Sequence, residues 1–377
     1  MRVIVGASVL AVVGAAGCVE QRFDVELAVT RAEALGDGVL QYNYGTDVDP
    51  VDASAASGKA VANGLALALD ATTIQFEAEV LGAVVGFGRS PVLEIPDGGT
   101  LVVPLLVAPT EAPGLVASRP ANVDDACIAA DDAGAFFFMG GTGSTRDGTV
   151  FDTAFKVREF GAGAFANVAS PTCAAHAGKV AVVDGATAVV FDVDGNSSTV
   201  DLDFIDVPAG AIAVPRSDDG LWVVDGDNDI FHVDANGVAD PVATASGART
   251  SGLEVTANDS LVMVAGGNLI YVDEVLLNLG PAQALGRRLK QVFVFDGDTI
   301  SVIENAATTV VKSVSFPAMS SFGMLSDGRA VGLTAAGQFI DEDGSYSGRS
   351  QRAMVVLGGD VVLLGGSGNG FDGIAFR

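Results

Sequence analysis

Short apolar runs, each followed by a turn, recur along most of the chain. Typical runs occupy residues 180–183 and 221–224, and they are followed by Asp184-Gly185 and Asp225-Gly226. Four-residue runs are too short for helices, and because they are apolar on both faces they favour strands buried between neighbouring sheets. The Asp-Gly and Gly-Gly pairs supply the positive φ angles that tight hairpins need.

These runs form a repeat that fills the second part of the chain. The seven copies of the run lie at 136–139, 180–183, 221–224, 261–265, 292–295, 330–334 and 361–364, with 30 to 44 residues between successive turns. This is the spacing of blades in a β-propeller, so we predict an all-β fold with a propeller of about seven blades at 122–377. The last copy is about one strand short of a blade, and residues 114–118 are a candidate for the missing strand. A β-sandwich or a β-solenoid array is the alternative.

Residues 22–108 have a different pattern of polar and apolar positions. Polar and apolar residues alternate at 23–29, and further strand-like runs follow at 38–44, 65–69, 73–81, 84–87, 92–95 and 101–107. Gly, Pro and Asp-Gly separate them, which predicts a small antiparallel β-sandwich. A helix over residues 53–69 competes for the middle of this region. Three prolines indicate a linker at 109–121.

Two segments carry resemblances to known families. Double glycines follow apolar runs at Gly140-Gly141, Gly266-Gly267, Gly358-Gly359 and Gly365-Gly366. In this feature the repeat region resembles the kelch family of propellers, although the Tyr and Trp residues of kelch blades are mostly missing. Residues 76–90 are similar to the immunoglobulin- or transthyretin-like module that precedes repeats in some myxobacterial-type lipoproteins.

The chain opens with Met1, Arg2 and an uncharged apolar run over residues 3–17. As a helix, this run rises about 22 Å, less than the roughly 30 Å of membrane hydrocarbon, so a cleaved secretory signal is favoured over a permanent span. The run ends at Ala15-Ala16-Gly17-Cys18, which resembles the lipobox of bacterial lipoproteins, with Ala15 in place of the commoner Leu.

The lipobox resemblance implies a membrane-anchored protein. Residues 1–17 would be the signal, Cys18 would carry the lipid, and residues 18–21 would be a short tether. Val19 after the cysteine implies the outer membrane by the rule known for enteric bacteria. The alternative is an ordinary signal peptide, which would leave Cys18 as a spare thiol.

The charge of the chain excludes one class of function. The 377 residues include 47 acidic and 20 basic ones, a net charge of −27. Proteins that bind the phosphate backbone of nucleic acids carry a basic patch, so nucleic-acid binding is excluded. The acids are explained by a solvated surface with acidic turns, and an acidic recognition face is the alternative.

Cysteines and histidines limit the candidate metal sites. With Cys18 assigned to lipid, Cys127 and Cys173 remain, both in the presumed first strands of adjacent copies, where a disulfide is feasible. Two buried free thiols are the alternative. The chain has only two histidines, His176 and His232, and three cysteines, which excludes three-histidine metal sites, four-cysteine zinc sites and iron–sulfur clusters.

Alternating acids suggest calcium as a weaker possibility. Asp225, Asp227 and Asp229 alternate, as do Asp192, Asp194 and Asn196. Oxygen ligands at that spacing can hold Ca²⁺. An EF-hand starting at Asp225 fails, however, because it would need Gly at 230 and Glu at 236. Hairpin turns account for both clusters, so we expect no cofactor and keep calcium at Asp225, Asp227 and Asp229 as the alternative.

No catalytic motif accompanies the repeats. A Gly-x-Ser-x-Gly elbow and a P-loop are both missing, and the sole tryptophan, Trp222, is expected in the core. We therefore predict a non-catalytic binding or scaffold protein of the cell envelope, with a protein or glycan partner. One alternative is a propeller enzyme acting on a glycan or other envelope substrate. Such an enzyme would gather His, Tyr, Arg and acids at one channel mouth, where Arg287, Arg288, Arg349 and Arg352 are the candidate arginines. Another is a calcium-stabilised adhesin.

Overall fold

The computed structural model describes seventeen stretches of the chain. They are residues 2–5, 23–36, 41–46, 53–56, 74–90, 99–118, 127–131, 136–140, 147–151, 157–159, 172–205, 210–250, 252–288, 290–346, 353–357, 361–365 and 370–376. Within these stretches the fold is all-β, with one turn of 3₁₀-helix, η1 (Glu33–Leu35), and no α-helix. None of the described helical segments has the length and hydropathy to cross a membrane.

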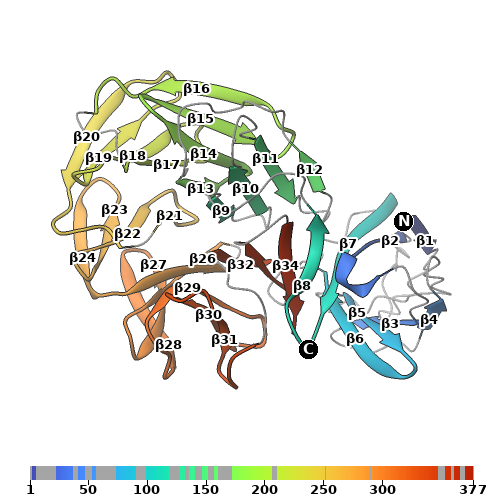
Figure 1. Ribbon diagram of the computed structural model, residues 1–377. Helices are drawn as coiled ribbons and strands as arrows, with labels where there is room; N and C mark the ends of the chain where they lie inside the picture. Colours follow the sequence, from blue (N-terminus) through green and yellow to red (C-terminus); the bar gives the residue numbers. More distant parts are fainter. Residues whose placement is uncertain are drawn as a thin grey trace, which may run out of the picture.

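Small antiparallel sheets follow one another in chain order from residue 127 (Figure 1). We number them sheets 1 to 7. Sheet 1 holds β9 (Cys127–Ala130), β10 (Phe136–Gly140), β11 (Asp147–Phe151) and β12 (Val157–Glu159). Sheet 2 holds β13 (Cys173–His176), β14 (Lys179–Asp184), β15 (Thr187–Asp192) and β16 (Ser197–Asp201). Sheet 3 holds β17 (Ile212–Pro215), β18 (Leu221–Val224), β19 (Asp229–Val233) and β20 (Ala239–Thr244).

The remaining sheets repeat this order. Sheet 4 holds β21 (Glu254–Val255), β22 (Leu261–Ala265), β23 (Asn268–Val272) and β24 (Leu276–Pro281). Sheet 5 holds β25 (Ala284–Arg288), β26 (Gln291–Phe295), β27 (Thr299–Glu304) and β28 (Ala307–Ser313). Sheet 6 holds β29 (Met319–Met324), β30 (Ala330–Thr334) and β31 (Phe339–Asp341). Sheet 7 holds β32 (Ala353–Leu357), β33 (Val361–Gly365), β34 (Gly370–Ala375) and β8 (Gly114–Ser118).

The sheets form a β-propeller, which confirms the predicted fold class (Figure 1). The apolar runs of the repeat are the second strands of the sheets. In β18, Leu221 and Val223 pack toward sheet 2, whereas Trp222 and Val224 pack toward sheet 4. Because successive side chains point to opposite faces of a strand, a sheet between two others needs apolar residues at every position.

The ring is closed by a strand from the N-terminal side. β8 pairs antiparallel with β34, so that Ser118 lies opposite Gly370 and Gly114 opposite Gly373. The prediction that residues 114–118 complete the last sheet is confirmed. The expected linker at 109–121 therefore contains a strand of the propeller and is not simply a connection.

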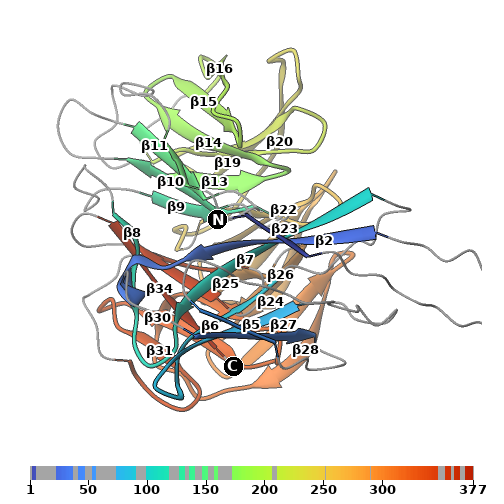
Figure 2. The ribbon, with the colours of Figure 1, turned by 90° about the vertical axis from the view of Figure 1, so that its right-hand side faces the viewer.

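The N-terminal strands form a separate seven-stranded sheet. In spatial order its strands are β1 (Arg2–Val5), β2 (Phe23–Arg31), β7 (Gly99–Pro109), β6 (Ala83–Arg89), β5 (Ile74–Val80), β3 (Gln41–Thr46) and β4 (Ala53–Ala56). β2 and β7 run parallel, side by side, from Phe23 opposite Gly99 to Arg31 opposite Val107 (Figure 2). The prediction of a purely antiparallel module is wrong at this pair, because the long connection through β3 to β6 allows a parallel return.

The structure describes only part of the region for which a helix at 53–69 and strands at 65–69 and 92–95 were considered. The helix considered for residues 53–69 is wrong at its start, because Ala53–Ala56 is strand β4, paired with β3. Residues 57–69 lie outside the described residues, as do the predicted strands at 65–69 and 92–95. The N-terminal sheet packs on the propeller through a shared core of Phe87, Leu106 and Ala108 against Leu363 and Ala375.

Candidate functional site

A cavity of about 230 Å³ lies where the first strands of the sheets meet. Most of its wall is apolar or small, from β9, β13, β29 and β32. Its polar groups are Glu254, Arg287, Ser320 and Ser321. The described lining includes neither His nor Tyr, so only part of the set expected of a propeller enzyme gathers here.

The charged groups of the cavity pair with each other. Arg287 Nε donates to Glu254 Oε2 at 2.7 Å, and Arg287 Nη2 donates to the carbonyl oxygen of Val255. Arg287 is only 7% exposed. A buried guanidinium needs such partners, because an unpaired buried charge costs several kcal/mol of folding free energy, about 3–5 kcal/mol when one partner is removed.

The other candidate arginines do not join this pair. Arg288 donates from Nη1 to the carbonyl oxygen of Leu325 at 2.8 Å and from Nη2 to Gln291 Oε1 at 2.7 Å. Arg349 and Arg352 lie outside the described residues, as does Cys18. Their expected roles therefore stay predictions.

Cys127 and Cys173, the pair proposed from the sequence, are joined by a disulfide. Their Cα atoms lie 5.8 Å apart, on β9 and β13. Cys173 also lines the central cavity. The bond therefore ties the first strands of sheets 1 and 2 together at the wall of the cavity.

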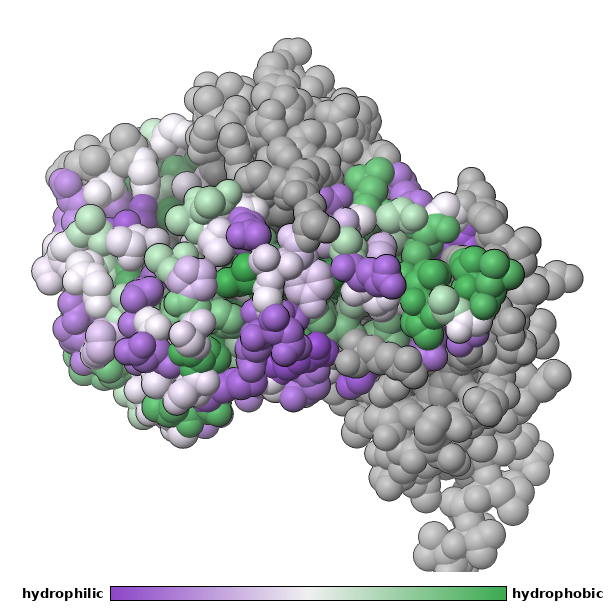
Figure 3. Space-filling view, turned by 60° about the horizontal axis from the view of Figure 1, so that its bottom comes forward, coloured by the Kyte–Doolittle hydropathy of each residue, from purple (hydrophilic) through white to green (hydrophobic). Residues whose placement is uncertain are grey.

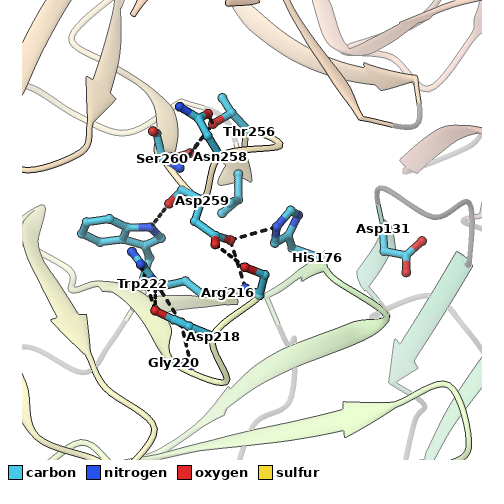
Figure 4. Close-up of polar contacts among 12 residues, drawn as sticks. Asp131, His176, Arg216, Asp218, Gly220, Trp222, Thr256, Asn258, Asp259 and Ser260 are labelled. Atoms are coloured by element: carbon cyan, nitrogen blue, oxygen red, sulfur yellow. Dashed lines mark hydrogen bonds and ion pairs between the residues drawn. The ribbon is translucent and has the colours of Figure 1, made fainter. Parts of the chain in front are cut away.

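A polar network joins sheets 2, 3 and 4 around Asp259 (Figure 4). Asp259 Oδ1 lies 3.1 Å from Nε2 of His176 and accepts the backbone N–H of Ser217 at 2.9 Å. Its Oδ2 accepts the hydroxyl of Ser217, and its carbonyl oxygen accepts the indole N–H of Trp222 at 2.7 Å. Both histidines of the chain lie near this network, since the centre of the His232 ring is 5.6 Å from the centre of the Trp222 ring.

The network keeps Asp259 ionised. Burial alone would raise the pKa of Asp259, but the hydrogen bonds from the Ser217 hydroxyl and backbone, together with His176 and Arg216, lower it below its ordinary value. Asp259 has a φ of 63° in the turn between β21 and β22, a conformation that Asp tolerates better than most residues. This residue was missed by sequence reasoning. The only signal for it is the turn Asn258-Asp259 itself.

Trp222 is buried, as expected from its place in an apolar run, with 2% of its surface exposed. The guanidinium of Arg216 lies 5.1 Å from the centre of its ring. Arg216 also donates to both carboxylate oxygens of Asp218, at 3.1 and 3.0 Å. The hydrogen bond from Arg216 lowers the pKa of Asp218. Burial and the contact with Arg216 leave Trp222 without a face for a ligand to stack on.

The calcium candidates cap turns. Asp225 is 2% exposed, and its Oδ1 accepts the backbone N–H groups of Asp227 and Asp229, both at 2.9 Å. Asp192 Oδ1 likewise accepts the N–H groups of Asp194 at 2.9 Å and Asn196 at 2.8 Å. The same arrangement recurs at Asp234, Asp296 and Asp341. In the part of the chain that the structure describes, no three His, Cys, Asp or Glu side chains converge to hold a metal ion.

A groove lies between sheets 2 and 3. It measures about 610 Å³, against 230 Å³ for the central cavity and 480 Å³ for a hollow beside β31. We call it the polar groove. Its polar side chains are Lys179, Asp192, Asn196, Ser197, Ser198, Thr199, Asp201, Asp219, Asp234 and Asn236. Lys179, its only cation among these residues, pairs with Asp219.

Comparison with solved structures supports the propeller fold. Virginiamycin B lyase from Staphylococcus aureus matches with a TM-score of 0.53 and 9% identity, over 69% of this chain and 98% of that one. The β-propeller domain of Cps50 (Swd1) from Myceliophteria thermophila matches with a TM-score of 0.51 and 11% identity, over 67% and 97%. At these identities the likeness concerns the fold alone. No family model matches the chain, and no curated protein matches it in sequence.

Proposed function

We propose that this protein is a non-catalytic binding or scaffold protein of the bacterial cell envelope, and that its propeller binds a protein or glycan partner. The observation that carries the proposal is the polar groove. Its volume of about 610 Å³ falls within the roughly 300–1,000 Å³ of ligand sites. Hydroxyl, amide and carboxylate groups from two sheets line it, and these groups suit the polar surface of a peptide or a sugar.

The central cavity gives catalysis less support than the groove gives binding, because its charged groups, Arg287 and Glu254, are engaged with each other. Solved structures with this fold include a lyase and the propeller domain of Cps50, so the fold itself favours neither reading. The alternative, a propeller enzyme acting on an envelope glycan, is favoured by one observation, which is the carboxylate of Glu254 at the wall of a cavity.

The anchor belongs to this proposal. The lipobox-like residues ending at Cys18 support a lipid attached to that cysteine and a place at the outer membrane. Replacing Cys18 with Ser is expected to move the protein from the membrane fraction to the soluble fraction and to remove the mass of the acyl chains. The kelch-like label rests on double glycines, of which only Gly266-Gly267 lies wholly within the described residues.

Site-directed photo-crosslinking in cells tests the groove. A photoreactive residue at Asn236, in the groove, should trap a partner, whereas the same residue at exposed Val275 on sheet 4 should not. Adding Asp201→Lys should abolish the Asn236 adduct, because it reverses a charge in the groove. Equal adducts at both positions would contradict the proposal that the partner binds in the polar groove.

The enzyme alternative needs its own measurement. The purified protein is incubated with peptidoglycan fragments and with outer-membrane polysaccharide, and the products are analysed by mass spectrometry. We expect no new product. Turnover that Glu254→Gln abolishes would replace the binding proposal with catalysis in the central cavity.

A further inference from the structure

The outermost strand of sheet 5 is open to solvent on the rim of the propeller. Among the described strands β28 pairs with β27 alone (Figure 1). Residues 307–311 are all exposed, including Val310 at 61% and Val311 at 48%. Figure 3 turns this lower rim toward the viewer, where hydrophobic side chains stand among hydrophilic ones.

β28 differs from the other outer strands of sheets 2 to 5. Natural sheets use charges, prolines or bends to keep their edge strands from pairing with other chains. β16 carries Asp201, β20 carries Asp240 and Pro241, and β24 ends in Gly280-Pro281. β28 has seven residues with no acid and no proline, and its single charge, Lys312, is paired with Glu342 at 2.6 Å. A shift in register leaves Val311 without a partner on β27, so the regular part of the edge ends at Val310.

We propose that β28 pairs edge to edge with β28 of a second copy of this chain. An open strand edge presents backbone N–H and C=O groups, and another extended strand can pair with them. In an antiparallel pair about a two-fold axis at Thr309, Thr308 of each copy lies opposite Val310 of the other. These residues are Thr or Val, which form favourable cross-strand pairs. The two Lys312 side chains lie at opposite ends, so no like charges meet.

The lack of charge on residues 307–311 reduces the electrostatic repulsion between two copies that meet at this edge. Each copy carries a net charge of −27, so most pairs of surfaces repel. Residues 307–311 are uncharged, and contact through them brings no carboxylates into direct opposition. Salt screens the remaining repulsion, so the dimer should strengthen as ionic strength rises. A single strand pair is smaller than the roughly 1,200 Å² of stable complexes, so the association should be weak and concentration-dependent.

Sedimentation equilibrium of the Cys18→Ser chain tests the proposal. The average mass should rise from one copy toward two with protein concentration, and more steeply in concentrated salt than in dilute salt. Val310→Lys places a charge on the edge and should keep the chain monomeric at every concentration. Leu277→Lys, on the exposed outer strand β24, is the matched control and should self-associate like its parent. Monomeric parent protein throughout, or a dimer that survives Val310→Lys, overturns the proposal.

Cysteine trapping decides the case if Val310→Lys fails to fold. In the Cys18→Ser background, Thr309→Cys should give a covalent dimer under mild oxidation, and Leu277→Cys on β24 should not. Equal cross-linking of both variants would reveal random collision and overturn the assignment. Cross-linking of Thr309→Cys in cells only to a different protein would assign the edge to that protein's strand, and self-pairing would be rejected.

Discussion

The side chains of His176 and Asp259 lie 3.1 Å apart, although 83 residues separate them in the sequence. The contact runs from sheet 2 to sheet 4, past Ser217 and Trp222 of sheet 3. One carboxylate thus links three consecutive sheets, whose shared cores are apolar.

Asp259→Ala is expected to lower the free energy of unfolding by about 2–3 kcal/mol, because it leaves His176 and the Ser217 N–H without their acceptor. Urea unfolding followed by the fluorescence of Trp222, the only tryptophan, measures this loss. Asp240→Ala on the exposed strand β20 is the control and should change the midpoint little. Equal effects of the two substitutions would contradict the structural role of Asp259.

Acid should destabilise the propeller below about pH 4, the ordinary range of aspartate pKa values. The pKa values of Asp192, Asp259 and Asp296 are lowered in the folded protein, because hydrogen bonds to each carboxylate outweigh burial. A lowered folded-state pKa gives stability that is fully present above the unfolded-state pKa and is lost as the pH falls through the folded-state value.

Asp296→Asn provides the test of this acid dependence. The amide oxygen can still accept the turn N–H groups, but it does not titrate. Unfolding measured from pH 6 to pH 3 should therefore show a shallower loss than the parent shows. An unchanged slope would mean that Asp296 does not contribute to it.

The disulfide should stabilise the fold substantially. Cys127 and Cys173 are 46 residues apart, and closing a loop of that length contributes about 4 kcal/mol in the chain-entropy model. The double variant Cys127→Ser/Cys173→Ser is expected to unfold at lower urea concentration by that free energy. The parent treated with reductant should match the variant, and a parent indifferent to reductant would contradict the prediction.

Asp225 distinguishes turn capping from metal binding. Asp225→Ala should cost about 1–3 kcal/mol, because two backbone N–H groups lose their acceptor, whereas Asp225→Asn keeps an acceptor and should cost less. Calcium should leave the thermal midpoint of the parent and of both variants unchanged. A calcium-dependent rise in the parent that both variants lose would instead assign a metal site to Asp225.

Arg287 and Glu254 should behave as a coupled pair. Arg287→Met is expected to destabilise the protein by about 3 kcal/mol, because Glu254 is left without its partner. Adding Glu254→Gln should recover part of that loss. Additive losses in the double variant, measured by urea unfolding, would show that the two side chains do not interact.

Much of the fold was predictable because it depends on local pattern. The apolar runs identified the second strands of the sheets, since a sheet between two others must be apolar on both faces. The closing strand at Gly114–Ser118 could be predicted from the count of strands in the last repeat. The parallel pairing of β2 with β7 could not, because alternation marks a strand but does not choose its partner.

The site was less predictable because its contacts are distant in sequence. Asp259 meets His176 and Ser217 only once three sheets are packed, and its turn resembles many others in the chain. The alternating acids at Asp225, Asp227 and Asp229 suggested an ion, but a turn in which Asp225 accepts the backbone N–H groups two and four residues further on has the same spacing.

The pairing of β8 with β34 has a consequence for biogenesis. About 250 residues separate the two strands, so a chain under synthesis must hold Gly114–Ser118 without its partner until Gly370–Ala375 has emerged. Until then the ring is open, and the edge of β8 that pairs with β34 lacks that strand. A chain truncated before β34 therefore cannot close the ring.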